Sequence, residues 1–189
     1  MTPKAINATA INAEYGVVTE PATLTLHRVL PGPIKRAWDY LTVSDLRRQW
    51  LAEGEMPMEV GSAFELVWHN DELTTPPGQR PEGFGGEHRM SSVITACDPP
   101  HTLAFTWGST GGVSFELREQ GQHVLLTLTH RRILDPELQL KISAGWHGHL
   151  DVLVARANGV EPAPFWDTWL RLKGDYAARL AGRGAAPQH

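Results

Sequence analysis

The sequence is poor in cysteine and has no long apolar run. Its only cysteine, Cys97, cannot form an internal disulfide, and one thiol is too few for a structural zinc site. No segment is apolar over the roughly 20 residues that a helix needs to cross a bilayer. Residues 1–20 also lack the apolar core of a signal peptide. We therefore expect a cytoplasmic protein with no membrane partner.

Positive charge is scarce and scattered. The chain has 17 lysines and arginines against 21 acidic residues, which gives a formal net charge of -4. Nucleic-acid binding needs clustered cations that neutralise phosphates, and here Arg47-Arg48 and Arg131-Arg132 are isolated pairs. The composition therefore argues against a nucleic-acid partner, and the length of 189 residues suits a single globular domain.

The chain lacks the signatures of common catalytic and metal sites. No nucleophile stands beside a base, and Gly83-Phe84-Gly85-Gly86 lacks the strand-to-helix context of a dinucleotide loop. His147 and His149 are two residues apart on a predicted helix, so they diverge, whereas His147 and Asp151 have the spacing of an exposed helical ion pair. We predict no catalytic residue, no metal and no cofactor, although a cyclase-like or hydrolytic enzyme remains an alternative.

The first part of the chain alternates between strand and helix patterns. From Thr23 to Leu30, leucines alternate with polar residues, which predicts a half-buried strand. From Ile34 to Leu41, apolar residues recur at helical spacing. Thr42-x-x-Asp45 has the spacing of a capping box and predicts a second short helix, with Leu46 and Trp50 on one face.

The middle of the chain is predicted to form a meander of antiparallel strands. After Pro57 the apolar period changes to two and stays so as far as Leu128, so the sheet should span Thr23 to Arg132. The segment from Asn70 to Gly86 is rich in proline and glycine and is predicted to be a long mobile loop. Cys97 falls in one of these strands as a passive residue.

The last part of the chain returns to a helical period. Its pattern predicts a helix from about Glu137 to Ala157 that packs Trp146 and Leu150 against the concave face of the sheet. After a break at Gly159 to Pro164, a second apolar stripe runs from Phe165 to Leu180 and is expected to dock within the chain instead of on another subunit.

These patterns divide the chain into three parts. Residues 23–182 form one domain, residues 183–189 a C-terminal tail, and residues 1–22 an N-terminal extension. We expect the first dozen residues of the extension to be a mobile tail.

Several short motifs resemble a known family. Leu30-Pro31-Gly32-Pro33 before Ala37-Trp38, the run from Asp98 to Trp107, and Gly145-Trp146 are similar to segments of the activators of the heat-shock chaperone ATPase and their homologues. The resemblance implies an α+β helix-grip fold, in which a curved antiparallel β-sheet wraps around a long C-terminal α-helix. It also implies the wider START and birch-pollen-allergen-like (SRPBCC) superfamily, whose members include lipid-transfer domains and aromatic polyketide cyclases.

Membership of that superfamily would imply a cavity between the sheet and the C-terminal helix. We therefore predict binding of a small hydrophobic or amphipathic molecule, without catalysis. A co-chaperone-like interaction domain with a role in the stress response, whose partner is a chaperone or a second copy of the chain, is the alternative. The predicted ligand-binding residues are those expected to point inward: Trp50, Trp68, Met90, Trp107, Phe115, His130 and Trp146.

Four of these residues, Trp68, Trp107, Trp146 and His130, are expected to bound the cavity near the Asn70 to Gly86 loop. His130 is the main polar candidate among them. The competing interpretation is that the same aromatic side chains simply fill an ordinary core.

Overall fold

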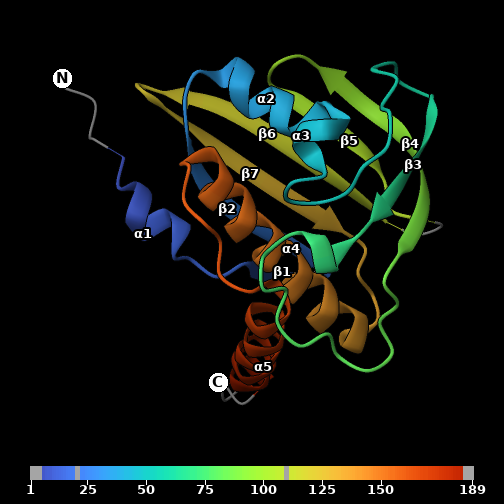
Figure 1. The fold of residues 1–189 in the computed structure, drawn as a ribbon, viewed down its shortest axis with the longest axis vertical. Coiled ribbons are helices and arrows are strands. Elements are labelled where there is room, and N and C mark those ends of the chain that lie inside the picture. Colours follow the sequence, from blue (N-terminus) through green and yellow to red (C-terminus); the bar gives the residue numbers. More distant parts are fainter. Residues whose placement is uncertain (1–5, 20–21, 109–110, 185–189) are drawn as a thin grey trace, which may run out of the picture.

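The protein is built on one antiparallel sheet with helices on its concave face. The computed structural model describes residues 6–19, 22–108 and 111–184. The sheet has the order β1-β2-β7-β6-β5-β4-β3 (Figure 1). Its strands are β1 (Val17–Thr19), β2 (Thr23–Pro31), β3 (Ala63–Trp68), β4 (His88–Asp98), β5 (Thr102–Thr106), β6 (Gly112–Gln120) and β7 (His123–Arg131). The predicted α+β helix-grip fold is confirmed.

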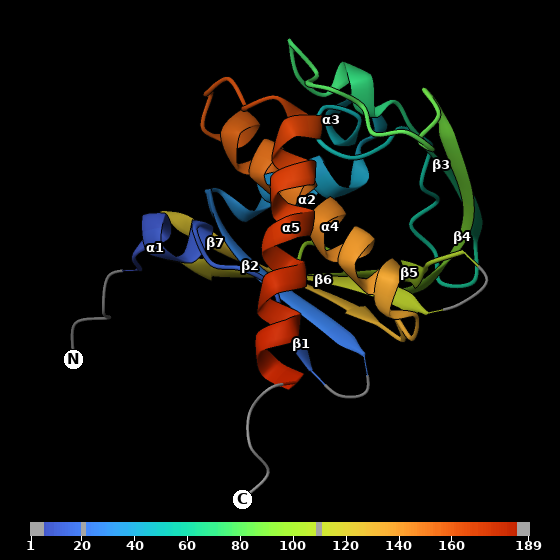
Figure 2. The same cartoon turned by 90° about the horizontal axis from the view of Figure 1, so that it is seen from below.

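The sheet is strongly curved. The pairing of β4 with β5 shifts register between Ile94 and Ala96, as a bulge does. A bulge bends the strand that carries it and increases the local twist. Figure 2 shows β3 and β4 turned up from the plane of the other strands, so that the sheet partly encloses the helices.

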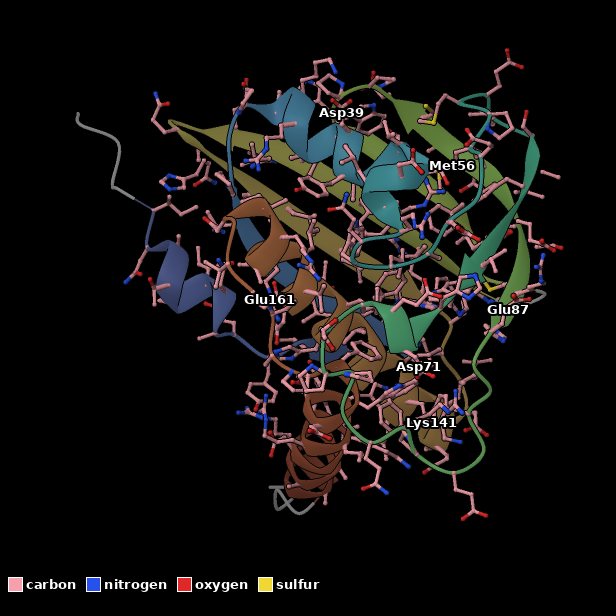
Figure 3. The ribbon with its side chains drawn as sticks, in the orientation of Figure 1. Asp39, Met56, Asp71, Glu87, Lys141 and Glu161 are labelled. Atoms are coloured by element: carbon pink, nitrogen blue, oxygen red, sulfur yellow. The ribbon has the colours of Figure 1, made fainter. Side chains whose placement is uncertain are left out.

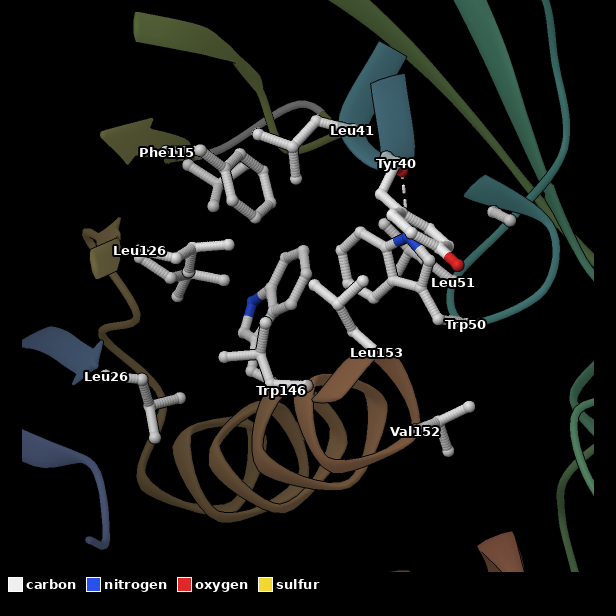
Figure 4. Packing of buried hydrophobic residues seen from close by; sticks show 14 of the residues in the cluster. Leu26, Tyr40, Leu41, Trp50, Leu51, Phe115, Leu126, Trp146, Val152 and Leu153 are labelled. Atoms are coloured by element: carbon white, nitrogen blue, oxygen red, sulfur yellow. Dashed lines mark hydrogen bonds between the residues drawn. The ribbon is translucent and has the colours of Figure 1, made fainter. Parts of the chain in front are cut away.

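The long helix α4 (Pro136–Ala157) lies on the concave face. Asp135 caps its first turn by accepting a hydrogen bond of 2.7 Å from the backbone N–H of Leu138. Trp146 and Leu150 are buried, as predicted. Figure 4 shows Trp146 pointing from α4 towards Phe115 of β6. Burial of each such side chain contributes about 2 kcal/mol, so this face anchors the helix.

The two short helices that precede β3 differ in part from the prediction. Helix α2 (Ile34–Thr42) is present, but α3 (Ser44–Arg47) ends after one turn. The predicted capping box is wrong, because the Thr42 hydroxyl donates back to the carbonyl of Trp38 at 2.9 Å instead of capping α3. The buried guanidinium of Arg47 closes the turn by donating to four carbonyls, those of Leu41, Thr42, Ala52 and Gly54.

The residue Trp50 therefore lies beyond α3 and not on it. Its indole N–H donates to the carbonyl of Tyr40 at 2.8 Å, and the side chain is fully buried (Figure 4). The predicted helical face shared by Leu46 and Trp50 is not formed.

The N-terminal extension, whose first dozen residues are predicted to be a mobile tail, contains regular structure from Ala8 onward. Helix α1 (Ala8–Asn12) and strand β1 both belong to the fold. The Asn12 side chain donates to the carbonyl of Val29 at 3.0 Å and accepts from its N–H at 2.6 Å, which ties α1 to β2. Residues 1–5, and residues 185–189 of the predicted C-terminal tail, lie outside the described residues.

The last helix, α5 (Phe165–Gly184), packs on α4, and the predicted docking within the chain is confirmed. A Cβ atom at Gly148 of α4 would lie 3.3 Å from the ring of Phe165, so the absence of a side chain there lets the helices approach closely. Trp166 is also buried, although the predicted stripe did not include it. Within the described ranges, no helix is long and apolar enough to cross a membrane.

The segment between β3 and β4 is fixed to the start of α5. It begins with a 3-10 turn, η1 (Asn70–Glu72). The Trp166 indole donates to Asp71 at 2.7 Å, and the Trp166 backbone N–H donates to the carbonyl of Pro77 at 2.9 Å. The hydroxyl of Thr74 accepts from the N–H of Phe165 at 3.0 Å. The predicted loop is therefore anchored over its first half.

Candidate functional site

A pocket of about 410 Å³ opens between the sheet, α4, α5 and the β3–β4 loop. Its walls are mostly aromatic and come from four parts of the chain. The main lining residues are Trp68 from β3, Trp107 directly after β5, Ile142, Gly145, Trp146 and His149 from α4, Phe165, Trp166 and Trp169 from α5, and residues 83–86 of the loop. The pocket lies where the superfamily resemblance implied a cavity.

The wall on the sheet side is a continuous row of rings. The ring centroids of Trp107 and Trp146 are 5.0 Å apart, and those of Trp68 and Trp107 are 5.7 Å apart. His88 extends the row at the rim, 5.4 Å from Trp68. These distances are in the range for favourable ring contacts, so the rings pack against one another as one wall.

The opposite side is covered by the loop and α5. Phe84 packs against Trp166 at 5.1 Å and Trp169 at 5.0 Å. Gly83 has a φ of +90°, a conformation that other residues rarely adopt, and this turn directs the loop back over the pocket. Because Phe84 has glycine on both sides and is 36% exposed, the cover has fewer restraints than the tryptophan wall.

The inner polar group of the pocket is His149. Its Nδ1 lies 2.8 Å from the carbonyl oxygen of Trp50. A carbonyl only accepts, so Nδ1 carries the ring proton and Nε2 is left as an acceptor. Burial lowers the pKa of His149 to about 4, against a smaller opposing effect of the Trp50 hydrogen bond, so the ring is neutral at pH 7.

The other polar groups of the pocket are nearer its mouth. Lys141 and Glu87 line the rim, and Figure 3 shows them on the same side of the molecule as Asp71. The side-chain amide of Asn70 also lines the pocket and makes no hydrogen bond within the described part of the chain, where its Oδ1 is buried. The site thus combines a large aromatic surface with a few polar groups, as small-molecule pockets commonly do.

His130 lies behind the tryptophan wall. Its Nδ1 accepts a hydrogen bond of 2.9 Å from the indole N–H of Trp146, and its ring packs 5.1 Å from Trp107. Burial lowers the pKa of His130 to about 4. This histidine was predicted to bound the cavity, but it does not line the pocket and instead fixes the orientation of the Trp146 ring.

The seven predicted binding residues divide into two groups. Trp68, Trp107 and Trp146 line the pocket. His130, Trp50, Phe115 and Met90 do not: Trp50 and Phe115 meet edge to face at 6.4 Å inside the core, and Met90 lies on β4 opposite Leu66. For Trp50 and Phe115, the competing interpretation as core side chains describes their positions.

The pocket residues that the prediction missed come from α5, from the loop and from α4. Phe165, Trp166, Trp169 and Phe84 complete the wall, and His149 supplies the inner polar group. The adjacent aromatic residues Phe165 and Trp166 were the available signal, because one helical stripe cannot account for both. Trp166 lies outside the predicted stripe, and both residues line the pocket.

A separate polar cluster lies on the other side of α4, and it corrects one prediction. His147 and Asp151 are not an exposed ion pair, because His147 is buried. Its Nδ1 is 3.0 Å from the Tyr176 hydroxyl and its Nε2 is 3.5 Å from Asp151. Asp151 instead pairs with the fully buried Arg28 at 3.1 Å. Burial, aided by the charge of Arg28, lowers the pKa of His147 to about 3.

Other candidate chemistry is limited in the described ranges. They contain no group of three histidine, cysteine or acidic side chains placed to hold a metal ion. Cys97 lies half-buried on β4, where burial raises the pKa of its thiol and so lowers the fraction present as the reactive thiolate.

Residues 31–158 match the family described as activator of Hsp90 ATPase homolog 1-like protein. The chain belongs to this family. A protein from Bordetella parapertussis with a known solution structure is 35% identical to this chain. The match covers 93% of this chain and 95% of that protein, with a TM-score of 0.75. A conserved protein of unknown function from Enterococcus faecalis is 19% identical, with coverages of 93% and 97% and a TM-score of 0.66.

A third similar structure is CalU16 from Micromonospora echinospora, which is 18% identical, with coverages of 87% and 93% and a TM-score of 0.60. The two more distant structures support the helix-grip fold of this activator-homologue family. Among curated proteins, none matches the chain.

Proposed function

We propose that this member of the activator-homologue family binds a small, flat, apolar or amphipathic molecule in the pocket between the sheet, α4 and α5. The observation that carries the proposal is the aromatic lining of a pocket of about 410 Å³. This volume is within the range of pockets that hold small-molecule ligands. Indole and phenyl faces favour flat rings, and the mouth beside Lys141 leaves room for a polar end.

Gly145 offers a way to test the pocket without touching its aromatic wall. A Cβ atom at this position of α4 would meet only the Trp169 indole nitrogen, at 3.9 Å. Gly145→Ala should therefore be tolerated and should stabilise the helix by about 0.5 to 1 kcal/mol. The larger side chain of Gly145→Leu would project into the pocket and occupy the space of a ligand.

The experiment compares these two variants with the wild-type protein. Each is titrated with a panel of fatty acids and flat aromatic compounds, and binding is followed by tryptophan emission and by the melting temperature. A ligand at 100 times its Kd should stabilise the wild-type protein and Gly145→Ala by about 2.7 kcal/mol. Gly145→Leu should fold but show neither response.

Two results would contradict the proposal. One is a panel that leaves emission and melting temperature of the wild-type protein unchanged. The other is equal binding by Gly145→Leu and Gly145→Ala, which would place the ligand outside this pocket.

A co-chaperone-like function is the second candidate, and the description of the matched family favours it. It predicts that the chain stimulates the ATPase of an Hsp90-type chaperone. Since such an interaction would use the outer surface, Gly145→Leu should stimulate as well as the wild-type protein. Stimulation without ligand binding would favour this second function, and the subunit count from native mass spectrometry would test a homodimer.

A further inference from the structure

The hydrogen bonds inside the pocket restrict the chemistry of its ligand. We propose that the ligand carries an aromatic hydroxyl or N–H group that donates a hydrogen bond to Nε2 of His149. This inference rests on the proposed function, because it requires that the pocket holds a ligand. It goes further by naming the chemical group that the ligand presents at the inner end.

The first step is the tautomer of His149. The carbonyl of Trp50 lies 2.8 Å from Nδ1 and can only accept, so the proton stays on Nδ1. In the described part of the chain, no group forms a hydrogen bond with Nε2. The ring lines the pocket, and one flank is packed 4.7 Å from Phe165. Nε2 is thus an acceptor without a partner in the described part of the chain, on a ring that lines the pocket, and an occupant of the pocket can supply the missing donor.

The second step is the sign of the charge at this position. A buried acceptor left without a partner destabilises the complex, so an apolar ligand that only fills the space is disfavoured. A carboxylate is disfavoured as well, because its oxygens would face a lone pair. Burial lowers the pKa of His149 to about 4, so the ring does not become a cation that could attract an anion at pH 7. A neutral hydrogen-bond donor on a flat ring gives Nε2 a partner and brings no negative charge next to its lone pair.

The third step is the amide of Asn70, which also lines the pocket. It makes no hydrogen bond within the described ranges and its Oδ1 is buried, so it is a second polar group of the pocket without a partner. An amide both donates and accepts, and so it suits a hydroxyl or a carbonyl equally. His149 is the stricter of the two groups because it can only accept.

The test uses three probes that share one ring system: 2-naphthol, 2-methoxynaphthalene and 2-naphthoate. Isothermal titration calorimetry at pH 7 measures each Kd for the wild-type protein. We expect 2-naphthol to bind about tenfold more tightly than 2-methoxynaphthalene, the difference that one satisfied hydrogen bond produces. The naphthoate should bind more weakly than the naphthol.

The variant His149→Asn isolates the acceptor. The amide nitrogen of Asn is as far along the side chain as Nδ1, so it can still donate to the Trp50 carbonyl, but nothing replaces Nε2. This variant should bind 2-naphthol and 2-methoxynaphthalene with similar Kd values. His123→Asn, a change on β7 at a residue that does not line the pocket, is the matched control and should keep the tenfold preference.

The outcomes separate this inference from the proposed function. If none of the probes binds the wild-type protein, the proposed function fails and the inference fails with it. If 2-naphthol and 2-methoxynaphthalene bind equally well, the pocket binds ligands but the inference is overturned. A preference that survives in His149→Asn also overturns it. Should that variant not fold, the ¹⁵N resonance of Nε2 in the wild-type protein decides, because it must shift when 2-naphthol is added.

Discussion

Acidification should unfold this protein well above the pH at which its carboxylates titrate. Three histidines are buried as neutral rings, and burial lowers the pKa to about 4 for His130, about 3 for His147 and about 4 for His149. A histidine in an unfolded chain has a pKa near 6.5. Protons therefore bind the unfolded state before they bind the folded one.

The direction of the effect follows from these values. A group whose pKa is lower in the folded state contributes stability that is complete above the unfolded pKa and is lost as the pH falls towards the folded pKa. At pH 5 each of the three histidines costs roughly 2 kcal/mol relative to pH 8, or about 6 kcal/mol together. Asp151 acts in the opposite direction, because burial raises its pKa, and it offsets part of this loss at the acid end.

The assay is urea unfolding, followed by tryptophan emission, at several pH values between 8 and 4.5. A loss of about 6 kcal/mol is comparable with the total stability of most domains, so the midpoint should fall steeply below pH 6.5. His149→Asn and His130→Asn should each reduce the slope by about 1.4 kcal/mol per pH unit, and His123→Asn should leave it unchanged. An unfolding free energy that stays constant from pH 8 to pH 5 would refute the reasoning.

Two further predictions concern the helices. Arg28→Met should destabilise the protein by about 3 kcal/mol, because it leaves Asp151 and the carbonyls of Glu14 and His27 without their cation; a smaller denaturant midpoint at unchanged m-value would show this. Truncation after Asn158 removes α5 and uncovers α4, so it should abolish the folded monomer in size-exclusion chromatography; a stable truncated monomer would show that α5 is dispensable.

The parts of the fold that could be predicted from the sequence are those with many repeats of one pattern. The alternation from Phe64 to Leu128 and the helical stripe through Trp146 and Leu150 each bury one continuous face, so local periodicity and tertiary packing agree. The one-turn helix α3 and the five-residue α1 instead depend on the hydrogen bonds of single side chains, which periodicity does not reveal. The first is held by the guanidinium of Arg47, which donates to carbonyls before and after it, and the second by the tertiary bonds of Asn12.

The pocket residues that could be predicted are those whose position follows from the inward face of a single strand or helix. Trp68, Trp107 and Trp146 follow from the inward faces of their strands and helix. The contribution of α5 depends on its packing angle against α4, which periodicity does not encode. The tautomer of His149 likewise depends on a carbonyl 99 residues away along the chain, in a segment whose local structure the prediction had wrong.

Some tryptophan indole N–H groups have a protein acceptor and others have none. Trp50, Trp146 and Trp166 each donate to a protein acceptor: the Tyr40 carbonyl, His130 and Asp71. The indoles of Trp68, Trp107 and Trp169 line the pocket and donate to no acceptor in the described part of the chain, and the buried Trp38, which does not line the pocket, also donates to none there.

This division predicts different costs for the same replacement. Trp146→Phe leaves the buried His130 acceptor unpaired and opens a gap beneath the wall, so it should destabilise the protein by about 2 to 4 kcal/mol. Trp107→Phe breaks no hydrogen bond and removes only part of a half-buried ring, so it should cost about 1 kcal/mol while weakening the binding of flat aromatic probes. Urea unfolding and calorimetry on both variants provide the comparison. If Trp107→Phe destabilises the protein as much as Trp146→Phe and leaves probe binding intact, Trp107 is a core residue and the division by hydrogen bonding is wrong.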